Sequence, residues 1–150
     1  MSGAFEGDLI GPLGLVTLYF GYAEAQVNLL LSMLQECGVA VVVSPIAPLG
    51  QRLKEFASVA AGFPESSAAE VLGLLEESKV LIEQRNELVH ASILAKGRVI
   101  PNDPARVEFR VTPDQLTDLA ERAFNWKERL NAAVQLRLLP ALRERSSRGT

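Results

Sequence analysis

The sequence contains very few of the residues from which disulfides and metal sites are built. Among its 150 residues there is one cysteine, Cys37, and one histidine, His90. A single cysteine cannot form an internal disulfide, and one cysteine with one histidine cannot supply the four ligands of a structural zinc site. We therefore expect no metal and no cofactor. Cys37 fits a small apolar residue near a helix end better than a nucleophile.

Long apolar runs are also missing. The stretch from Leu9 to Ala23 has no charged residue, but its 15 residues are interrupted by three glycines and a proline. It is too short to cross a bilayer, and the acidic residues before it are unlike the basic start of a signal peptide. We expect no membrane association and, by default, a cytoplasmic location.

Positive charge is scarce over most of the chain. Residues 1–95 hold four Lys/Arg and eleven Asp/Glu, a net charge of −7, whereas residues 121–150 hold seven and three, a net charge of +4. Sequence-independent binding of nucleic acid requires a broad basic face, so the acidic bulk argues against it. A narrow phosphate site remains compatible with this distribution.

Hydrophobic periodicity predicts an all-α fold, a helical bundle of four to five helices in a single domain over 1–150. Apolar residues make up 48% of the chain, which is typical of a globular protein. Helices are expected over residues 13–36, 49–62, 66–94 and 112–139. We expect a flexible lead-in over 1–12 and a frayed tail over 143–150, beyond a helix end marked by Pro140.

A small β-hairpin is expected before the last helix. Two strand-like runs between residues 98 and 111 flank the turn-forming residues 101–104. Thr112 and Gln115 then have the spacing of a capping box, with Pro113 in the first turn of the helix. The run 39–43 fits either a short strand or a buried connector, and periodicity does not decide between them.

The first long helix has two apolar stripes. One contains Phe20, Val27, Leu31 and Leu34, and the other contains Leu15, Leu18, Tyr19, Tyr22, Leu29, Leu30 and Met33. A helix with two apolar faces can pack on its own core and on a partner subunit. Glu24 interrupts the first stripe, where a carboxylate needs a partner.

The residues best suited to chemistry lie together in Arg85-Asn86-Glu87-Leu88-Val89-His90, near the end of the third helix. Arg85 interrupts a seam of apolar pairs spaced by seven. Asn86 and His90 are four residues apart and share a face with Glu83. Arginine binds phosphate through a planar fork of donors, and histidine titrates near neutral pH. The cluster therefore predicts chemistry on a phosphodiester.

This hexapeptide resembles the arginine, polar residue, three variable residues, histidine signature of the HEPN superfamily (higher eukaryotes and prokaryotes nucleotide-binding domain). The flanking residues 82–91 and the order of the helices are also similar, over most of residues 13–139. The resemblance implies a dimeric helical bundle and a metal-independent endoribonuclease. The expected reaction is attack of the RNA 2′-hydroxyl on the adjacent phosphorus, which leaves a cyclic phosphate and a free 5′-hydroxyl.

The resemblance also implies roles for individual residues. Arg85 would orient the phosphate and stabilise its developing charge, and His90 would move protons. Asn86 would hold the imidazole or contact the phosphate. From the stripe pattern of the first helix, and not from the resemblance, we expect Glu24 to face the motif and hold Arg85. Glu83, one turn before the motif face, is expected to support the cluster.

Two hypotheses of different class follow. The first is an RNA-cleaving homodimer, of a toxin or defence kind, with an antitoxin or another protein as partner. A two-fold axis would bring two copies of His90 together to act as base and acid. The second is a non-catalytic dimeric domain that binds a nucleotide or a protein, with Arg85, Asn86 and His90 as a structural cluster. Metal catalysis is disfavoured, because the Glu-x-x-His pattern occurs once, at residues 87–90.

Overall fold

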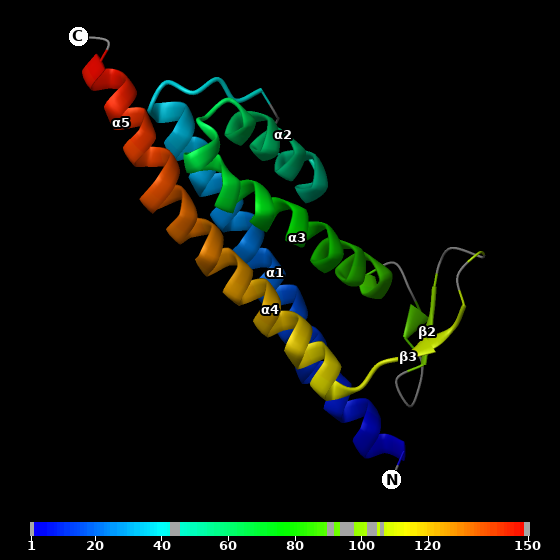
Figure 1. Ribbon diagram of the computed structural model, residues 1–150. Coiled ribbons are helices and arrows are strands. Elements are labelled where there is room, and N and C mark those ends of the chain that lie inside the picture. The colour runs from blue at the N-terminus through cyan, green and yellow to red at the C-terminus, as the bar shows by residue number, and fades with distance from the viewer. Residues whose placement is uncertain are drawn as a thin grey trace. The chain divides into compact units, whose positions relative to one another are not determined.

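The computed structural model describes residues 2–42, 46–89, 92–93, 98–101, 105 and 107–148. The fold is all-α, a helical bundle with a small β insertion, as the periodicity predicts (Figure 1). The elements in chain order are α1 (Ser2–Glu36), α2 (Leu49–Ala61), α3 (Glu65–Val89), β1 (Ser92–Ile93), β2 (Arg98–Ile100), β3 (Phe109–Arg110), α4 (Pro113–Ala133), the π-helical segment η2 (Val134–Leu138) and α5 (Leu139–Arg148). Over these described residues, no helix combines the length and the apolar character that a bilayer crossing requires.

The chain divides into two compact units. Unit 1 comprises residues 1–21 and 80–124, and unit 2 comprises residues 22–79 and 125–150. The physical reason is helix length. At 1.5 Å per residue, the 35 residues of α1 extend over about 52 Å, so different stretches of one helix contribute to different units.

Unit 2 consists of helical segments from α1, α2, α3 and the α4–η2–α5 stretch. Its largest fully buried side chains are Val27, Leu30, Leu34, Phe56, Val71, Leu130, Val134 and Leu138. On α2, Leu53, Phe56, Val59 and Ala60 are buried. On α1, all four residues of the stripe with Phe20, Val27, Leu31 and Leu34 are buried, whereas only Leu30 of the other stripe is.

Unit 1 combines the first part of α1, the last part of α3, the strands and the start of α4. The strands form an antiparallel sheet in the order β1-β2-β3, in which Val99 pairs with both Ile93 and Phe109. The hairpin predicted over 98–111 is therefore confirmed, with residues 102–104 of its turn outside the described residues. Strand β1 was missed, since helical periodicity extended α3 to Leu94. Non-local pairing with β2 instead holds Ser92 and Ile93 in a strand.

The expected lead-in over residues 1–12 is helical, because α1 begins at Ser2 and contains Pro12. A proline inside a helix costs about 3 kcal/mol. Leu9 and Val16, on either side of it, are both buried. Burial of a large apolar side chain contributes about 1.5–3 kcal/mol, so these two residues offset the proline.

Helix α1 ends where the sequence predicts, at a glycine with a left-handed backbone. Gly38 has φ of +93°, its N–H donates to the Gln35 carbonyl, and the Val39 N–H donates to the Leu34 carbonyl. These two bonds form a Schellman motif, which satisfies carbonyls at the helix end. The run 39–43 fitted either a short strand or a buried connector. Residues 39–42 do not form a strand, and residue 43 lies outside the described residues.

The last helical stretch continues through Pro140, where its end was expected. The helix widens to π geometry over Val134–Leu138, and the Leu139 N–H donates to the Val134 carbonyl. A proline clashes with the carbonyl four residues earlier in a regular α-helix, and a widened turn relieves this clash. The region 143–148, expected to be frayed, is therefore helical to Arg148, and residues 149–150 lie outside the described part.

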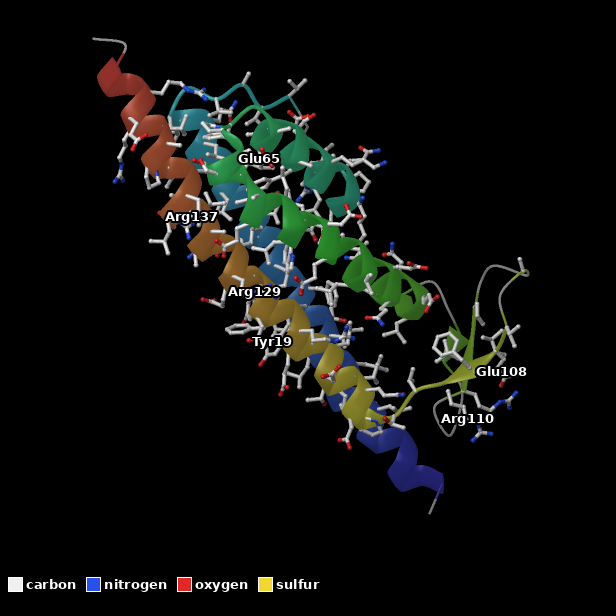
Figure 2. The ribbon with its side chains drawn as sticks, in the orientation of Figure 1. Tyr19, Glu65, Glu108, Arg110, Arg129 and Arg137 are labelled. Atoms are coloured by element: carbon white, nitrogen blue, oxygen red, sulfur yellow. The ribbon has the colours of Figure 1, made fainter. Side chains whose placement is uncertain are left out.

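The β-hairpin carries a pH-sensitive ion pair between Arg98 and Glu108. Glu108 is labelled in Figure 2. The hydrogen bond from Arg98 is the main cause that lowers the pKa of Glu108 below its ordinary value of 4.5. A lowered carboxyl pKa stabilises the folded state above the ordinary value, and this contribution is lost as the pH falls through the folded pKa. We expect an NMR titration to place the Glu108 pKa below 4.5, and Arg98→Ala to raise it. An unchanged pKa in Arg98→Ala would contradict this prediction.

Candidate functional site

Arg85 and Asn86 are brought together by the structure. The Arg85 Nε and Nη2 groups donate to Asn86 Oδ1 at 3.3 and 2.9 Å. Neighbouring residues on a helix do not normally face each other, so this contact requires the arginine to bend around the helix towards the amide. The convergence of this cation and this amide was inferred from the sequence, and the hydrogen bonds agree with it.

The Arg85 guanidinium is held from a second direction by an aromatic ring. It lies 5.7 Å from the ring centroid of Phe20 on α1, within the range of a cation–π contact. Arg85 interrupts the apolar seam of α3. Leu81 and Leu88 on this helix are buried, whereas the Arg85 side chain is half-buried. Among the described residues its Nη1 group donates no hydrogen bond. Arg85 is therefore fixed in position and still has donors for a ligand.

Glu24 has a different partner from the one expected. Its Oε1 lies 3.2 Å from Nη1 of Arg52, on α2, and the same Nη1 donates to Asn28 Oδ1 at 2.7 Å. The inference that Glu24 needed a partner was correct, but the assignment of Arg85 as that partner differs from the structure. Helical periodicity gave the face of Glu24 and could not show that α2 supplies an arginine there.

Arg52 is a buried charge that the sequence analysis missed. It is only 6% exposed, and its Nε is buried with no hydrogen-bond partner among the described residues. The sequence contained a signal for this burial, because Arg52 directly precedes Leu53 and lies one turn before Phe56, and both of these residues are buried.

Only some of the remaining candidate residues lie within the described part of the structure. Glu83 is exposed on α3, and Cys37, just after the end of α1, is also exposed. His90 lies outside the described residues, so its position relative to Arg85 stays a prediction. Over the described part of the chain, no three His, Cys, Asp or Glu side chains are grouped as a metal ion would need.

A cavity of about 290 Å³ opens in unit 1, beside the hexapeptide. It lies between the end of α3, the strand β3 and the start of α4, and Gln84 and Glu87 line it from α3. These two residues flank Arg85 and Asn86 in the sequence, so the cavity lies within one helical turn of the motif. Its buried apolar lining residues are Leu88, Val111, Leu116 and Leu119.

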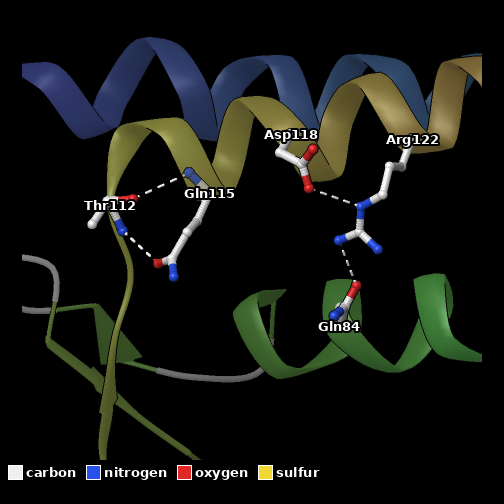
Figure 3. A network of polar contacts seen from close by, with 5 residues as sticks. All are labelled: Gln84, Thr112, Gln115, Asp118 and Arg122. Carbon is white, nitrogen blue, oxygen red and sulfur yellow. Dashed lines mark hydrogen bonds and ion pairs between the residues drawn. The ribbon is translucent and has the colours of Figure 1, made fainter.

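The polar rim of this cavity is organised by hydrogen bonds from α4 (Figure 3). Arg122 donates to Asp118 Oδ2 at 3.0 Å and to Gln84 Oε1 at 2.9 Å, which links α4 to α3. The predicted capping box is confirmed at the other end of the rim. Gln115 Oε1 accepts from the Thr112 N–H at 2.9 Å, and the Gln115 N–H donates to Thr112 Oγ1 at 3.1 Å.

Phe109 and Arg110 complete the lining from β3. Of the cavity residues on β3 and α4, only Gln115 was named from the sequence, and for the capping box alone. A signal existed in the spacing of Gln115, Asp118 and Arg122, which are three and four residues apart and share a helix face. Nothing local indicated that this face meets Gln84, because the contact joins residues 38 positions apart.

Comparison of the chain with protein-family models, with curated proteins and with solved structures finds no match.

Proposed function

We propose that this protein is a metal-independent endoribonuclease of the HEPN type, which cleaves RNA at a site containing Arg85, Asn86 and His90. The observation that carries the proposal is the state of Arg85. It is half-buried, clamped by Asn86 and Phe20, and has an Nη1 group with no partner among the described residues. A fixed guanidinium with available donors can stabilise the negative charge that develops on a phosphodiester during cleavage.

In the proposed reaction each residue has one task. Nη1 of Arg85 donates to a non-bridging phosphate oxygen and stabilises the negative charge that develops there. His90 removes the proton from the RNA 2′-hydroxyl, whose oxygen forms a bond to the phosphorus while the bond to the 5′-oxygen breaks. The departing 5′-oxygen takes up a proton, and the products are a cyclic phosphate and a 5′-hydroxyl. Asn86 keeps the guanidinium in its orientation.

The proposal includes a homodimer, because proton removal and proton donation are best served by two imidazoles. The second apolar stripe of α1 supports this part of the proposal. Leu18, Tyr22 and Leu29 are 46%, 47% and 55% exposed. A second copy of the chain that covers these side chains would bury apolar area and contribute to association.

The test is incubation of the purified protein with RNA in the presence of EDTA, beside a His90→Ala variant. We expect the native chain to cleave and to leave cyclic phosphate ends. We expect His90→Ala to be slower by about a hundredfold or more, the usual contribution of a general acid–base group. Arg129→Ala, purified in the same way, controls for a contaminating nuclease, because Arg129 is an exposed arginine of unit 2.

Equal cleavage by the native chain and His90→Ala, or cleavage by neither, would reject the proposal. Loss of cleavage on addition of EDTA would reject its metal-independent part. The hydrogen bonds between Arg85 and Asn86 also suit the second function, a non-catalytic domain with a structural polar cluster. Unfolding of His90→Ala, together with no cleavage by the native chain, would favour that function.

A further inference from the structure

We propose that the cavity of unit 1 binds a nucleobase of the RNA, with the phosphate of that nucleotide at Arg110. The inference rests on the proposed function for the identity of its ligand as a ribonucleotide. The cavity itself is defined by the described residues of α3, β3 and α4, independently of His90. Its volume of about 290 Å³ is that of a small-ligand site.

The lining matches a flat ligand with apolar faces and a polar edge. The floor is apolar, and Phe109, half-buried on β3, offers an aromatic face. Bases stack on aromatic side chains in many single-stranded RNA sites. The faces of a nucleobase can pack on this apolar floor, and its edge can form hydrogen bonds with the polar rim. An aliphatic ligand could not form those hydrogen bonds.

The rim offers hydrogen-bond donors whose orientation is already fixed. The side-chain carbonyl of Gln84 accepts from Arg122, and that of Gln115 accepts from the Thr112 N–H (Figure 3). Each bond determines which end of the amide is occupied and leaves the NH₂ group as the donor. Two such donors suit the ring nitrogens and carbonyl oxygens on the edge of a base.

The charged residues of the lining are the carboxylates Glu87 and Asp118 and the arginines Arg110 and Arg122. Arg122 is neutralised by Asp118 at 3.0 Å. Arg110, exposed at the cavity edge, makes no ion pair or hydrogen bond with any described residue (Figure 2). A neutral base in the cavity and a phosphate at Arg110 account for both features. Sequence-specific recognition of RNA generally reads unpaired bases in this way.

The experiment measures binding of the four ribonucleoside 3′-monophosphates to His90→Ala by calorimetry, so that cleavage does not contribute. We expect at least one nucleotide to bind with a dissociation constant below about 1 mM. Phe109→Leu keeps an apolar side chain but removes the aromatic face, and should weaken binding by about fivefold or more. Phe109→Tyr should retain binding. Arg110→Ala should weaken binding of the nucleotide and leave that of the matching nucleoside unchanged.

Val107→Ser is the matched control, because Val107 is near Phe109 in the sequence but 83% exposed and outside the cavity lining. Circular dichroism verifies that each variant is folded. Absence of nucleotide binding, or native affinity in a folded Phe109→Leu, would overturn the inference. Cleavage is measured separately, with Phe109→Leu and Arg110→Ala made in the native chain. If the native chain cleaves RNA, and these variants cleave normally and their His90→Ala counterparts bind normally, the cavity proposal alone fails. If nucleotides bind as expected but the native chain does not cleave RNA, the ribonuclease proposal alone fails.

Discussion

Replacement of Arg85 by alanine is expected to slow RNA cleavage by about a hundredfold to a thousandfold, with most of the loss in kcat. Removing one preorganised donor to a charge that develops in the transition state has this typical effect. The change should have only a small influence on stability, since a cation–π contact of a half-buried arginine contributes about 1 kcal/mol. The measurement is the single-turnover rate on a short RNA, together with thermal unfolding.

Arg85→Lys separates charge from geometry. Lysine keeps the positive charge but lacks the planar fork that Asn86 and Phe20 hold in place. Its rate should therefore lie between those of the native chain and Arg85→Ala. Arg129→Ala again provides the control, since it removes an exposed arginine paired with Glu77 at 3.0 Å (Figure 2). A folded Arg85→Ala that cleaves at the native rate would exclude Arg85 from the reaction.

Replacement of Trp126 by alanine is expected to lower the free energy of unfolding by about 3–5 kcal/mol, the cost of removing a large buried aromatic side chain. Trp126 is buried in unit 2, and its Nε1 donates to the Leu74 carbonyl on α3 at 2.7 Å. The residue therefore joins two helices by packing and by a hydrogen bond. Urea denaturation followed by circular dichroism measures the loss.

Trp126→Phe isolates the hydrogen bond from the packing. It keeps an aromatic ring, so its loss should be smaller than that of alanine, and the missing hydrogen bond accounts for about 1 kcal/mol of it. Leu136→Ala is the control for removal of a large apolar side chain, because Leu136 is 71% exposed on η2. Its effect should stay within about 0.5 kcal/mol. Similar losses for Leu136→Ala and Trp126→Ala would contradict the assigned role.

Local signals predicted much of the fold correctly. The end of α1 at Gly38 follows from a glycine that tolerates positive φ, and the start of α4 follows from the spacing of Thr112 and Gln115. Both are properties of a few consecutive residues. The proline signals failed, because the chain compensates for Pro12 by burial and for Pro140 by a π turn.

The site could be predicted only where its residues are neighbours in the sequence. Arg85 and Asn86 are adjacent in the sequence and were placed in one cluster, although a hydrogen bond between them was not predicted. The partner of Glu24 and the cavity residues on β3 and α4 come from other elements, and their meeting depends on tertiary packing. Periodicity gives the face of a residue on its own helix but does not identify the helix opposite it.

The widened turn at η2 lets the last helical stretch contain one more residue than a regular helix with the same buried face. Trp126, Leu130, Val134, Leu138 and Leu142 recur every four residues and are all buried. In a regular α-helix this spacing would rotate each residue about 40° further around the axis than the one before. The π segment absorbs the excess by fitting an extra residue into its turn. A regular α-helix of the same length would point Leu142 about 100° away from its present neighbours, whereas a regular helix one residue shorter over 134–138 would keep Leu142 on its present face.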